Sequence, residues 1–225
     1  MGIRLVVGLG NPGKEYERTR HNAGFWLVER FASANGVMLR KDGKFQALVG
    51  RHESAFLLMP QSFMNGSGRA VQMLAGFFKI KPEEMLVVHD ELDFAPGVAR
   101  VKQGGGIAGH NGLKDISQRL GSHDYWRLRV GIGHPGDKDA VADYVLQKPS
   151  AEDKTAIDQA IDRSLQVLPE MLKGDMQGAI QKLHSSEPKP VEKKEPPKKE
   201  IPVKEPEKQP QPKKSGLLGS LFGKK

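Results

Sequence analysis

The sequence has no cysteine, and nowhere does it stay apolar for long. Without cysteine the chain cannot build a disulfide framework, a thiolate zinc site or a thiol nucleophile, which agrees with a reducing cytosol. No stretch approaches the ~20 apolar residues of a membrane span. The N-terminal apolar run is short and polar residues follow it at once, so it does not resemble a signal peptide. We therefore expect a soluble protein located in the cytoplasm.

Two common hydrolase motifs are also missing. None of the 7 histidines belongs to an H-E-x-x-H motif or to a Cys/His cluster, which argues against zinc catalysis. No G-x-S-x-G follows an apolar strand-like run, which argues against a serine hydrolase. We expect neither a metal nor a cofactor.

Positive charge is in excess, but most of it lies near the C-terminus. Residues 187–225 hold 11 lysines and 6 glutamates, hence five of the eight net positive charges, together with 8 of the 15 prolines. Such a composition buries too little apolar surface to offset its ordering entropy, so residues 185–225 are predicted to be a disordered tail with a short apolar tip. The tail could contact RNA or a protein partner; a solvated tail without a role is the simpler interpretation.

Residues 1–184 alternate apolar strand-like runs with amphipathic segments, which predicts one α/β domain. Strands are predicted at 3–9, 45–50, 55–59, 85–89, 99–102 and 128–132. Helices are predicted at 23–34, 68–78, 111–120, 138–145, 151–172 and 175–184. Pro169 should kink or end the long helix that begins after Ser150. Three of the strand-like runs end in loops rich in Gly, Asn, Asp and His, where α/β sheets bind ligands, so the site is expected there.

One of these loops carries Gly8, Gly10 and Gly13, the spacing of a dinucleotide-binding fingerprint. That interpretation requires the third glycine to lie in the first turns of a helix and an acidic residue to end a second strand. Here Asn11 and Pro12 favour a turn, and the next helix is predicted only after residue 21. We reject the dinucleotide-binding interpretation.

A lone histidine, His21, lies at a polar junction just before the first predicted helix. It could be a general base or an ordinary structural histidine, and its position leaves both open. A helix N-terminus would lower its pKa and keep the imidazole neutral, as a base requires. Asp90 is the first acid after the strand at 85–89 and could hold a histidine in its productive tautomer. A metal-binding acid cluster or solvated loop acids are the alternatives.

Asparagines stand at three junctions between predicted elements. Asn11 follows the first strand, and Asn65 precedes a helix in a pattern that, taken alone, is typical of an N-cap. Asn111 lies in a glycine-rich segment, 104–112, with five glycines in nine residues. This density allows close approach of a ligand, and a helix start there favours anions.

Taken in series, these segments resemble bacterial peptidyl-tRNA hydrolases. The matching motifs are VGLGNPGKEY at 7–16, TRHNAG at 19–24, FMNGSG at 63–68, HDELD at 89–93, GGG with GHNGL between 104 and 113, and RVGIGHPG at 129–136. The resemblance covers residues 1 to about 184. It implies a compact α/β domain with a mixed, twisted sheet flanked by helices, and hydrolysis of the ester that joins a peptide to tRNA.

The resemblance also implies roles for individual residues. His21 would be the general base, Asp90 would hold it in its basic form, and Asn11 would distinguish N-blocked peptidyl-tRNA from free aminoacyl-tRNA. The tRNA end and the peptide main chain would contact Tyr16, Phe63, Asn65 and Asn111. A tRNA phosphate would be clamped by Lys102 and Arg129.

Elementary chemistry agrees with these roles. Ester hydrolysis requires a water that loses a proton as it attacks, and donors for the developing oxyanion. An oriented imidazole supplies the first and asparagine amides supply the second, without a metal or cofactor. We expect a monomer whose partner is peptidyl-tRNA. A non-catalytic RNA-binding module and a nucleotide-binding oxidoreductase remain as alternatives, which assays of ester hydrolysis and of NAD binding discriminate.

Overall fold

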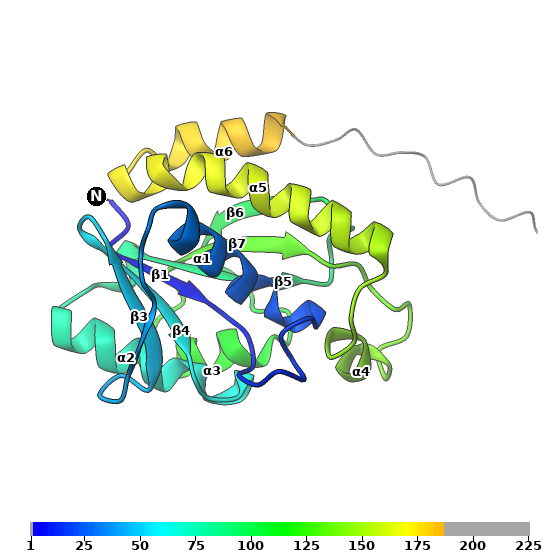
Figure 1. Cartoon of the computed structure of the whole chain (residues 1–225), viewed down its shortest axis with the longest axis horizontal. Helices are drawn as coiled ribbons and strands as arrows, with labels where there is room; N and C mark the ends of the chain where they lie inside the picture. The colour runs from blue at the N-terminus through cyan, green and yellow to red at the C-terminus, as the bar shows by residue number, and fades with distance from the viewer. Residues whose placement is uncertain (1, 187–225) are drawn as a thin grey trace, which may run out of the picture. The chain divides into compact units, whose positions relative to one another are not determined.

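A computed structural model gives the tertiary structure of the chain and describes residues 2–186. In this range seven strands form one sheet in the order β2-β3-β4-β1-β5-β7-β6, with helices on both faces (Figure 1). The predicted α/β class with a mixed sheet flanked by helices is confirmed. The predicted tail at 185–225 lies outside the described residues, except for its first two positions.

The strands are β1 (Leu5–Gly8), β2 (Arg40–Asp42), β3 (Ala47–His52), β4 (Ala55–Pro60), β5 (Met85–Glu91), β6 (Ala99–Gln103) and β7 (Trp126–Gly131). The α-helices are α1 (Ala23–Ala34), α2 (Ser67–Phe78), α3 (Asn111–Leu120), α4 (Val141–Val145), α5 (Ala151–Lys173) and α6 (Met176–Ser185). Three short 3-10 helices are η1 (Arg20–Asn22), η2 (Met64–Gly66) and η3 (Pro82–Glu84). Within residues 2–186, no helix combines the length and the hydropathy that crossing a membrane requires.

The four central strands run parallel, and antiparallel strands complete both edges. β4, β1, β5 and β7 pair in parallel, whereas β3 and β2 extend one edge and β6 the other in antiparallel pairing. Every residue of β1 and β5 is buried, as expected of parallel strands covered on both faces. Because β1 and β5 run parallel, their carboxyl ends lie side by side at the same end of the sheet, where the predicted site lies.

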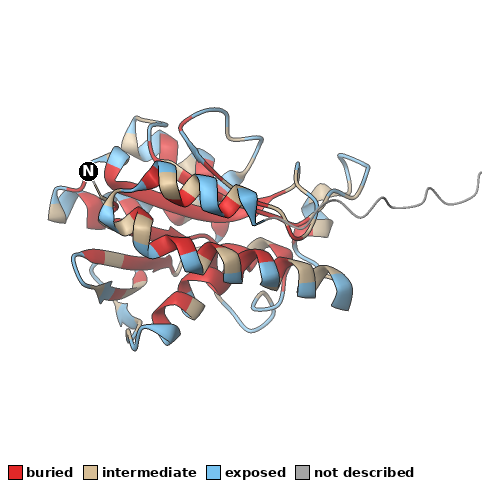
Figure 2. Cartoon of the chain, turned by 90° about the horizontal axis from the view of Figure 1, so that it is seen from above, coloured by how far each residue is buried: buried red, intermediate tan, exposed pale blue. Residues whose placement is uncertain are grey.

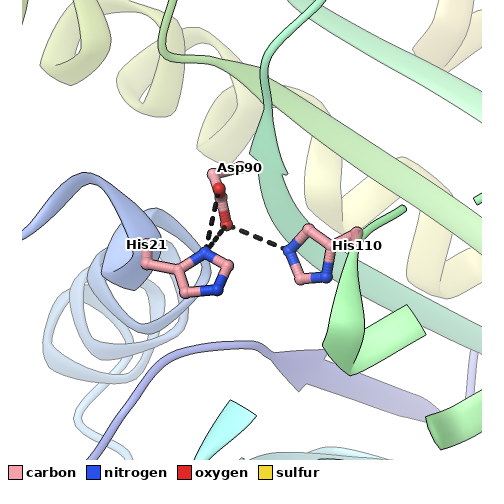
Figure 3. A group of neighbouring side chains, drawn as sticks. All are labelled: His21, Asp90 and His110. Atoms are coloured by element: carbon pink, nitrogen blue, oxygen red, sulfur yellow. Dashed lines mark hydrogen bonds and ion pairs between the residues drawn. The ribbon is translucent and has the colours of Figure 1, made fainter. Parts of the chain in front are cut away.

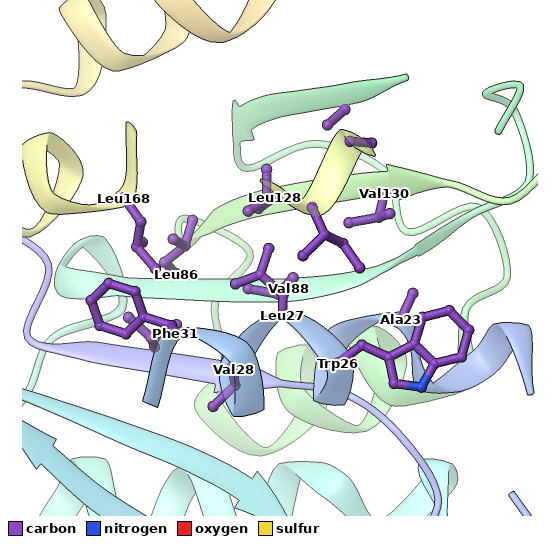
Figure 4. Close-up of a cluster of buried hydrophobic side chains, with 14 of the residues drawn as sticks. Ala23, Trp26, Leu27, Val28, Phe31, Leu86, Val88, Leu128, Val130 and Leu168 are labelled. Atoms are coloured by element: carbon purple, nitrogen blue, oxygen red, sulfur yellow. The ribbon is translucent and has the colours of Figure 1, made fainter. Parts of the chain in front are cut away.

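Alternating side chains of the central strands build two cores, one on each face of the sheet. Val6, Leu86 and Val88 face α1, α5 and α6, and Figure 4 shows part of this core between α1 and the sheet. Leu5 and Val7 face α2 and α3 on the opposite side. In Figure 2 the buried residues follow the sheet and the inner surfaces of the helices. Because both faces are filled, ligands can reach the sheet only at its ends and edges.

The long helix α5 corrects one prediction. It runs from Ala151 to Lys173 and contains Pro169, so the helix does not end at the proline as one of the two predicted outcomes required. Proline removes one backbone hydrogen bond, but Leu168 and Met171 around it are fully buried and continue the apolar stripe of the helix. Packing against the sheet outweighs the lost hydrogen bond. The helix ends instead at Gly174, which adopts a left-handed conformation.

Several element boundaries also differ from the predicted ones. β3 is shifted two residues toward the C-terminus from the predicted 45–50, and α4 is shorter than the predicted 138–145. The edge strand β2 was not predicted, because its residues are charged and only pairing with β3 makes them a strand. Local sequence specifies such short peripheral elements weakly.

Gly24 brings the start of α1 into direct contact with the sheet. A Cβ at this position would lie 2.3 Å from the carbonyl oxygen of Val88 and 2.4 Å from the main-chain nitrogen of Leu9. Only glycine permits this approach. It holds η1, which directly precedes α1, against the carboxyl ends of β1 and β5.

Candidate active site

His21 and Asp90 form a hydrogen-bonded pair at the carboxyl end of β5 (Figure 3). His21 lies in η1, and its Nδ1 is 2.9 Å and 3.0 Å from the two carboxylate oxygens of Asp90. A carboxylate can only accept, so Nδ1 carries the proton and Nε2 retains a lone pair. This is the tautomer of a general base.

A second imidazole, that of His110, binds the same carboxylate from the other side (Figure 3). Its Nε2 is 3.1 Å from Asp90 Oδ1, and its Nδ1 accepts the amide hydrogens of Gly112 and Leu113 at 3.2 Å and 3.4 Å. His110 is thus the N-cap of α3 and must carry its proton on Nε2. His110 was not among the predicted site residues, and its sequence signal is its place at a helix start after the glycine-rich loop.

These contacts set the pKa values of the pair in opposite directions. Burial alone would lower the pKa of His21, but the charge and the hydrogen bond of Asp90 outweigh it and raise that pKa above its usual value. Burial alone would raise the pKa of Asp90, yet His21 and His110 hold it well below its usual range. The expectation that a helix start lowers the His21 pKa is therefore wrong, because the carboxylate dominates.

The donor atoms of His21, Asp90 and His110 lie within 4.8 Å of one another, the spacing of a possible metal site. A metal at His110 Nε2 would need the lone pair of that nitrogen. The two backbone amides that bind Nδ1 fix the proton on Nε2, so His110 presents a hydrogen where a metal ligand needs an electron pair. In this arrangement the three side chains are better suited to proton transfer than to binding a metal ion.

His89 fixes the main chain beside this cluster. It is 1% exposed, its Nδ1 donates to the carbonyl oxygen of Asp90 at 2.7 Å, and its ring packs edge-on against His110. Burial lowers its pKa to about 3, with the neighbouring His110 acting in the same direction, so His89 remains neutral. His89 thus has a structural role beside the site and adds no charge to it.

Asn11 joins three segments at the end of β1. Its main-chain N–H donates to Asn22 Oδ1 at 2.8 Å, and Asn22 Nδ2 donates back to its carbonyl oxygen at 3.0 Å. Its own Oδ1 accepts the amide hydrogen of Met64 at 2.7 Å. These bonds fix the orientation of the Asn11 amide, and its Nδ2 has no partner in the described part of the chain. The position presents a hydrogen-bond donor that is already oriented.

The other predicted substrate-binding side chains are open to solvent. Phe63 is 61% exposed and packs edge-on against Tyr16 with ring centroids 6.1 Å apart. Asn65 and Asn111 are exposed and have no hydrogen-bond partner within residues 2–186. The interpretation of Asn65 as an N-cap is wrong, since Gly66 holds that position of α2 and no side chain caps it.

Lys102 lies on the edge strand β6, and Arg129 lies on β7, the strand paired with it. Lys102 is exposed, and Arg129 Nε donates to Glu91 at 2.8 Å while its guanidinium lies over the ring of Phe94. Arg127, opposite Lys102 in the pairing, was not predicted as a site residue. It is buried and donates to the carbonyl oxygens of Gly104 and Gly106, which holds the glycine-rich loop in place.

A cavity of about 490 Å³ joins several of these groups. Its lining includes His21, Asp90 and Asn111 on one side and Val141 and Val145 of α4 on the other. Asn11 lines a neighbouring cavity of about 400 Å³. The structure therefore gathers the predicted base, its carboxylate and one asparagine around one cavity, with Asn11 beside it.

Comparison with known proteins identifies the family. Residues 5–193 match the family model of peptidyl-tRNA hydrolase. The chain belongs to the peptidyl-tRNA hydrolase family. It is 54% identical over 193 residues to the peptidyl-tRNA hydrolase of Thiobacillus denitrificans, covering 86% of this chain and 96% of that protein. It is 56% identical over 187 residues to that of Nitrosospira multiformis, covering 81% of this chain and 98% of that protein.

The fold agrees with a solved member of the family. The crystal structure of peptidyl-tRNA hydrolase from Acinetobacter baumannii superposes with a TM-score of 0.80 at 44% identity, covering 83% of this chain and 97% of that one. The predicted family, α/β fold and hydrolase class are confirmed. Peptidyl-tRNA hydrolases cleave the ester bond of peptidyl-tRNA. The roles of individual residues remain predictions.

Proposed function

We propose that this chain hydrolyses peptidyl-tRNA with His21 as the general base and Asp90 as the group that orients it. The hydrogen bond from His21 Nδ1 to Asp90 carries the proposal, because it leaves Nε2 as the basic nitrogen. We assign this activity to the domain of residues 1–184.

The reaction needs one proton relay. As a water oxygen attacks the ester carbonyl carbon, its proton passes to His21 Nε2, and the carboxylate of Asp90 stabilises the imidazolium that forms. The bond between the carbonyl carbon and the ribose oxygen then breaks, and the imidazolium returns the proton to that oxygen. The products are a peptide with a free carboxylate and tRNA with a free terminal hydroxyl. Asn11 Nδ2 carries two hydrogens, of which we assign one to the carbonyl oxygen and the other to the blocked amino end of the substrate.

The groups that we assign to substrate binding make contacts that depend little on the tRNA sequence or on the peptide side chains. We assign Tyr16, Phe63, Asn65 and Asn111 to the tRNA end and the peptide main chain. The exposed ring of Phe63, the half-buried ring of Tyr16 and the two exposed amides offer stacking and uncharged hydrogen bonds. Lys102 and Arg129 would bind a backbone phosphate, which orients tRNA without base readout. Such contacts suit an enzyme that accepts many tRNAs.

We also propose that the chain works in the cytoplasm as a monomer. His21, Asp90, His110 and Asn11 all come from one chain, so the proposed reaction requires no partner subunit. Light scattering on the purified chain measures this state. A contact of the lysine-rich residues 187–225 with RNA or a protein remains a proposal, which the salt dependence of tRNA affinity tests.

The proposed function predicts rapid release of N-acylated amino acid from N-acylaminoacyl-tRNA. In single-turnover assays without added metal or cofactor, the wild-type chain should hydrolyse this substrate and leave free aminoacyl-tRNA nearly intact, because Asn11 is assigned to the blocked amino end. Binding of tRNA without hydrolysis would favour the RNA-binding module instead.

A second prediction concerns His110. Asparagine at this position can still cap α3 but is too short to reach Asp90. Without the Nε2–H donor, the charge of Asp90 acts on His21 alone and raises its pKa further. In His110→Asn the acid limb of the rate profile should move to higher pH, while the plateau changes by less than about threefold. His184→Asn, on α6, is the matched control, and an unshifted acid limb in His110→Asn would contradict the assignment.

A further inference from the structure

We propose that Arg20 is a positioning residue. It holds α4, one wall of the substrate cavity, in a fixed position relative to His21, the proposed base. The inference rests on the proposed function of His21, its neighbour in sequence. Arg20 was not among the predicted site residues. Its role follows from contacts that only the tertiary structure creates.

The buried guanidinium of Arg20 binds three carbonyl oxygens, one in the last turn of α4 and two in the segment that directly follows it. Nη1 donates to Lys148 at 3.0 Å, to Gln147 at 3.4 Å and to Tyr144 at 3.5 Å. Its plane lies over the ring of Tyr144, with Cζ 4.1 Å from the centroid. Nη2 is 3.5 Å from a carboxylate oxygen of Asp153, in the first turn of α5. A single side chain thus joins η1 to the end of one helix and the start of the next.

The main chain reinforces this link. The amide of Arg20 donates to the carbonyl oxygen of Gln147 at 3.1 Å. At the other side of α4, the hydroxyl of Tyr144 donates to the carbonyl oxygen of Ile132 at 2.7 Å, just beyond β7. The wall is therefore tied at two points, and one of them is the turn that carries His21.

α4 depends on such external contacts. It spans five residues, whereas isolated helices shorter than ~12–15 residues are marginal in water. Its last carbonyl groups have no partner within the helix, and a cation at a helix C-terminus is favourable. Because Val141, Ala142 and Val145 line the cavity beside His21, a loosened α4 changes the shape of the space that receives the substrate.

The proposal predicts that Arg20 affects substrate binding more than the chemical step. In Arg20→Ala, KM should rise about tenfold or more while kcat falls less than about threefold. The acid limb of the kcat profile should remain at its wild-type pH, because the hydrogen bond between His21 and Asp90 is untouched. Arg20→Lys should recover part of the loss, since one ammonium group can reach some of the carbonyl oxygens but cannot reproduce the planar fork.

Hydrogen exchange tests the contact without any assay of hydrolysis. The amides of Tyr144 and Gln147 should exchange faster in both Arg20 variants, while those of α1 keep their wild-type rates. A wild-type chain that failed to hydrolyse N-acylaminoacyl-tRNA would overturn the proposed function, yet unchanged exchange in α4 would separately overturn the contact.

Arg30 provides the matched control. It lies on α1 and pairs with Asp158 and Asp162 of α5, so it also links two elements, but away from the cavity. Arg30→Ala and Arg30→Lys should lower the melting temperature and keep KM at its wild-type value. An unchanged KM in Arg20→Ala, or an equal rise of KM in the Arg30 variants, refutes the proposal. If Arg20→Ala does not fold, the comparison of Arg20→Lys with Arg30→Lys decides the question.

Discussion

Replacing His21 with alanine is expected to lower kcat for N-acylaminoacyl-tRNA hydrolysis by about 10³-fold, within the range that general-base catalysis contributes. The variant lacks the only nitrogen whose lone pair is kept free by the bond to Asp90. Binding of tRNA should change little, because the groups assigned to phosphate and to the tRNA end lie elsewhere. Single-turnover kinetics, with tRNA affinity measured in parallel, separate the two effects.

The fold should survive this substitution. Asp90 loses one donor but keeps the Nε2–H of His110, so the buried charge is not left alone. His52→Ala is the control and should retain the wild-type rate, because His52 pairs with the first residue of β4, away from the carboxyl ends of the parallel strands. Near-normal turnover by a folded His21→Ala chain would eliminate His21 as the base.

The second large effect is expected for Asp90→Asn, with a loss of about 10² to 10⁴ in kcat, since the same change at an orienting aspartate elsewhere reverses a histidine tautomer. Asp90 Oδ1 accepts from both imidazoles, and Oδ2 also lies within hydrogen-bond distance of His21, but an amide replaces one of these oxygens with an NH2 group that only donates. If the amide nitrogen faces His21, its Nδ1 must become the acceptor, and the proton moves to Nε2, where the base is needed.

For Asp90→Asn we also predict the direction in which the acid limb of the pH–rate profile moves. The negative charge of Asp90 raises the His21 pKa against the effect of burial. Once that charge is removed, burial acts unopposed and the His21 pKa falls, so the acid limb of the residual activity should move to lower pH. Asp162→Asn removes an exposed carboxylate of α5 and should leave the profile unchanged. An acid limb that stays in place in Asp90→Asn would show that Asp90 does not set the His21 pKa.

The central part of the fold could be predicted because its local signals agree with its packing. β1 and β5 read as continuous apolar runs, and both strands are buried on both faces. Predictions failed where tertiary packing outweighs local preference. Pro169 remains inside α5 because the residues around it are buried, and β2 exists only through its pairing with β3.

The site shows the same division. Asn11 and Asp90 stand in motifs at strand ends and His21 stands in a motif just before a helix, so the sequence indicated all three as candidates. His110, Arg20 and Arg127 were not predicted as site residues, because their decisive partners lie 20 to 128 residues away in the sequence: the carboxylate of Asp90 for His110, and main-chain carbonyl oxygens for the two arginines. A histidine that caps a helix and an arginine that binds carbonyl oxygens look like any polar residue until the partner is in place.

By itself, the sequence determined the fold class and the family and indicated candidate residues for ester hydrolysis, because periodicity and motif spacing are local properties of the chain. Only the tertiary structure decided how those residues work together. The tautomer of His21, the sharing of one carboxylate by two imidazoles, and the attachment of α4 to the catalytic turn depend on distances between segments 20 to 128 residues apart. Hydrogen bonds and pKa values respond to distance in space, and this is fixed only when the chain has folded.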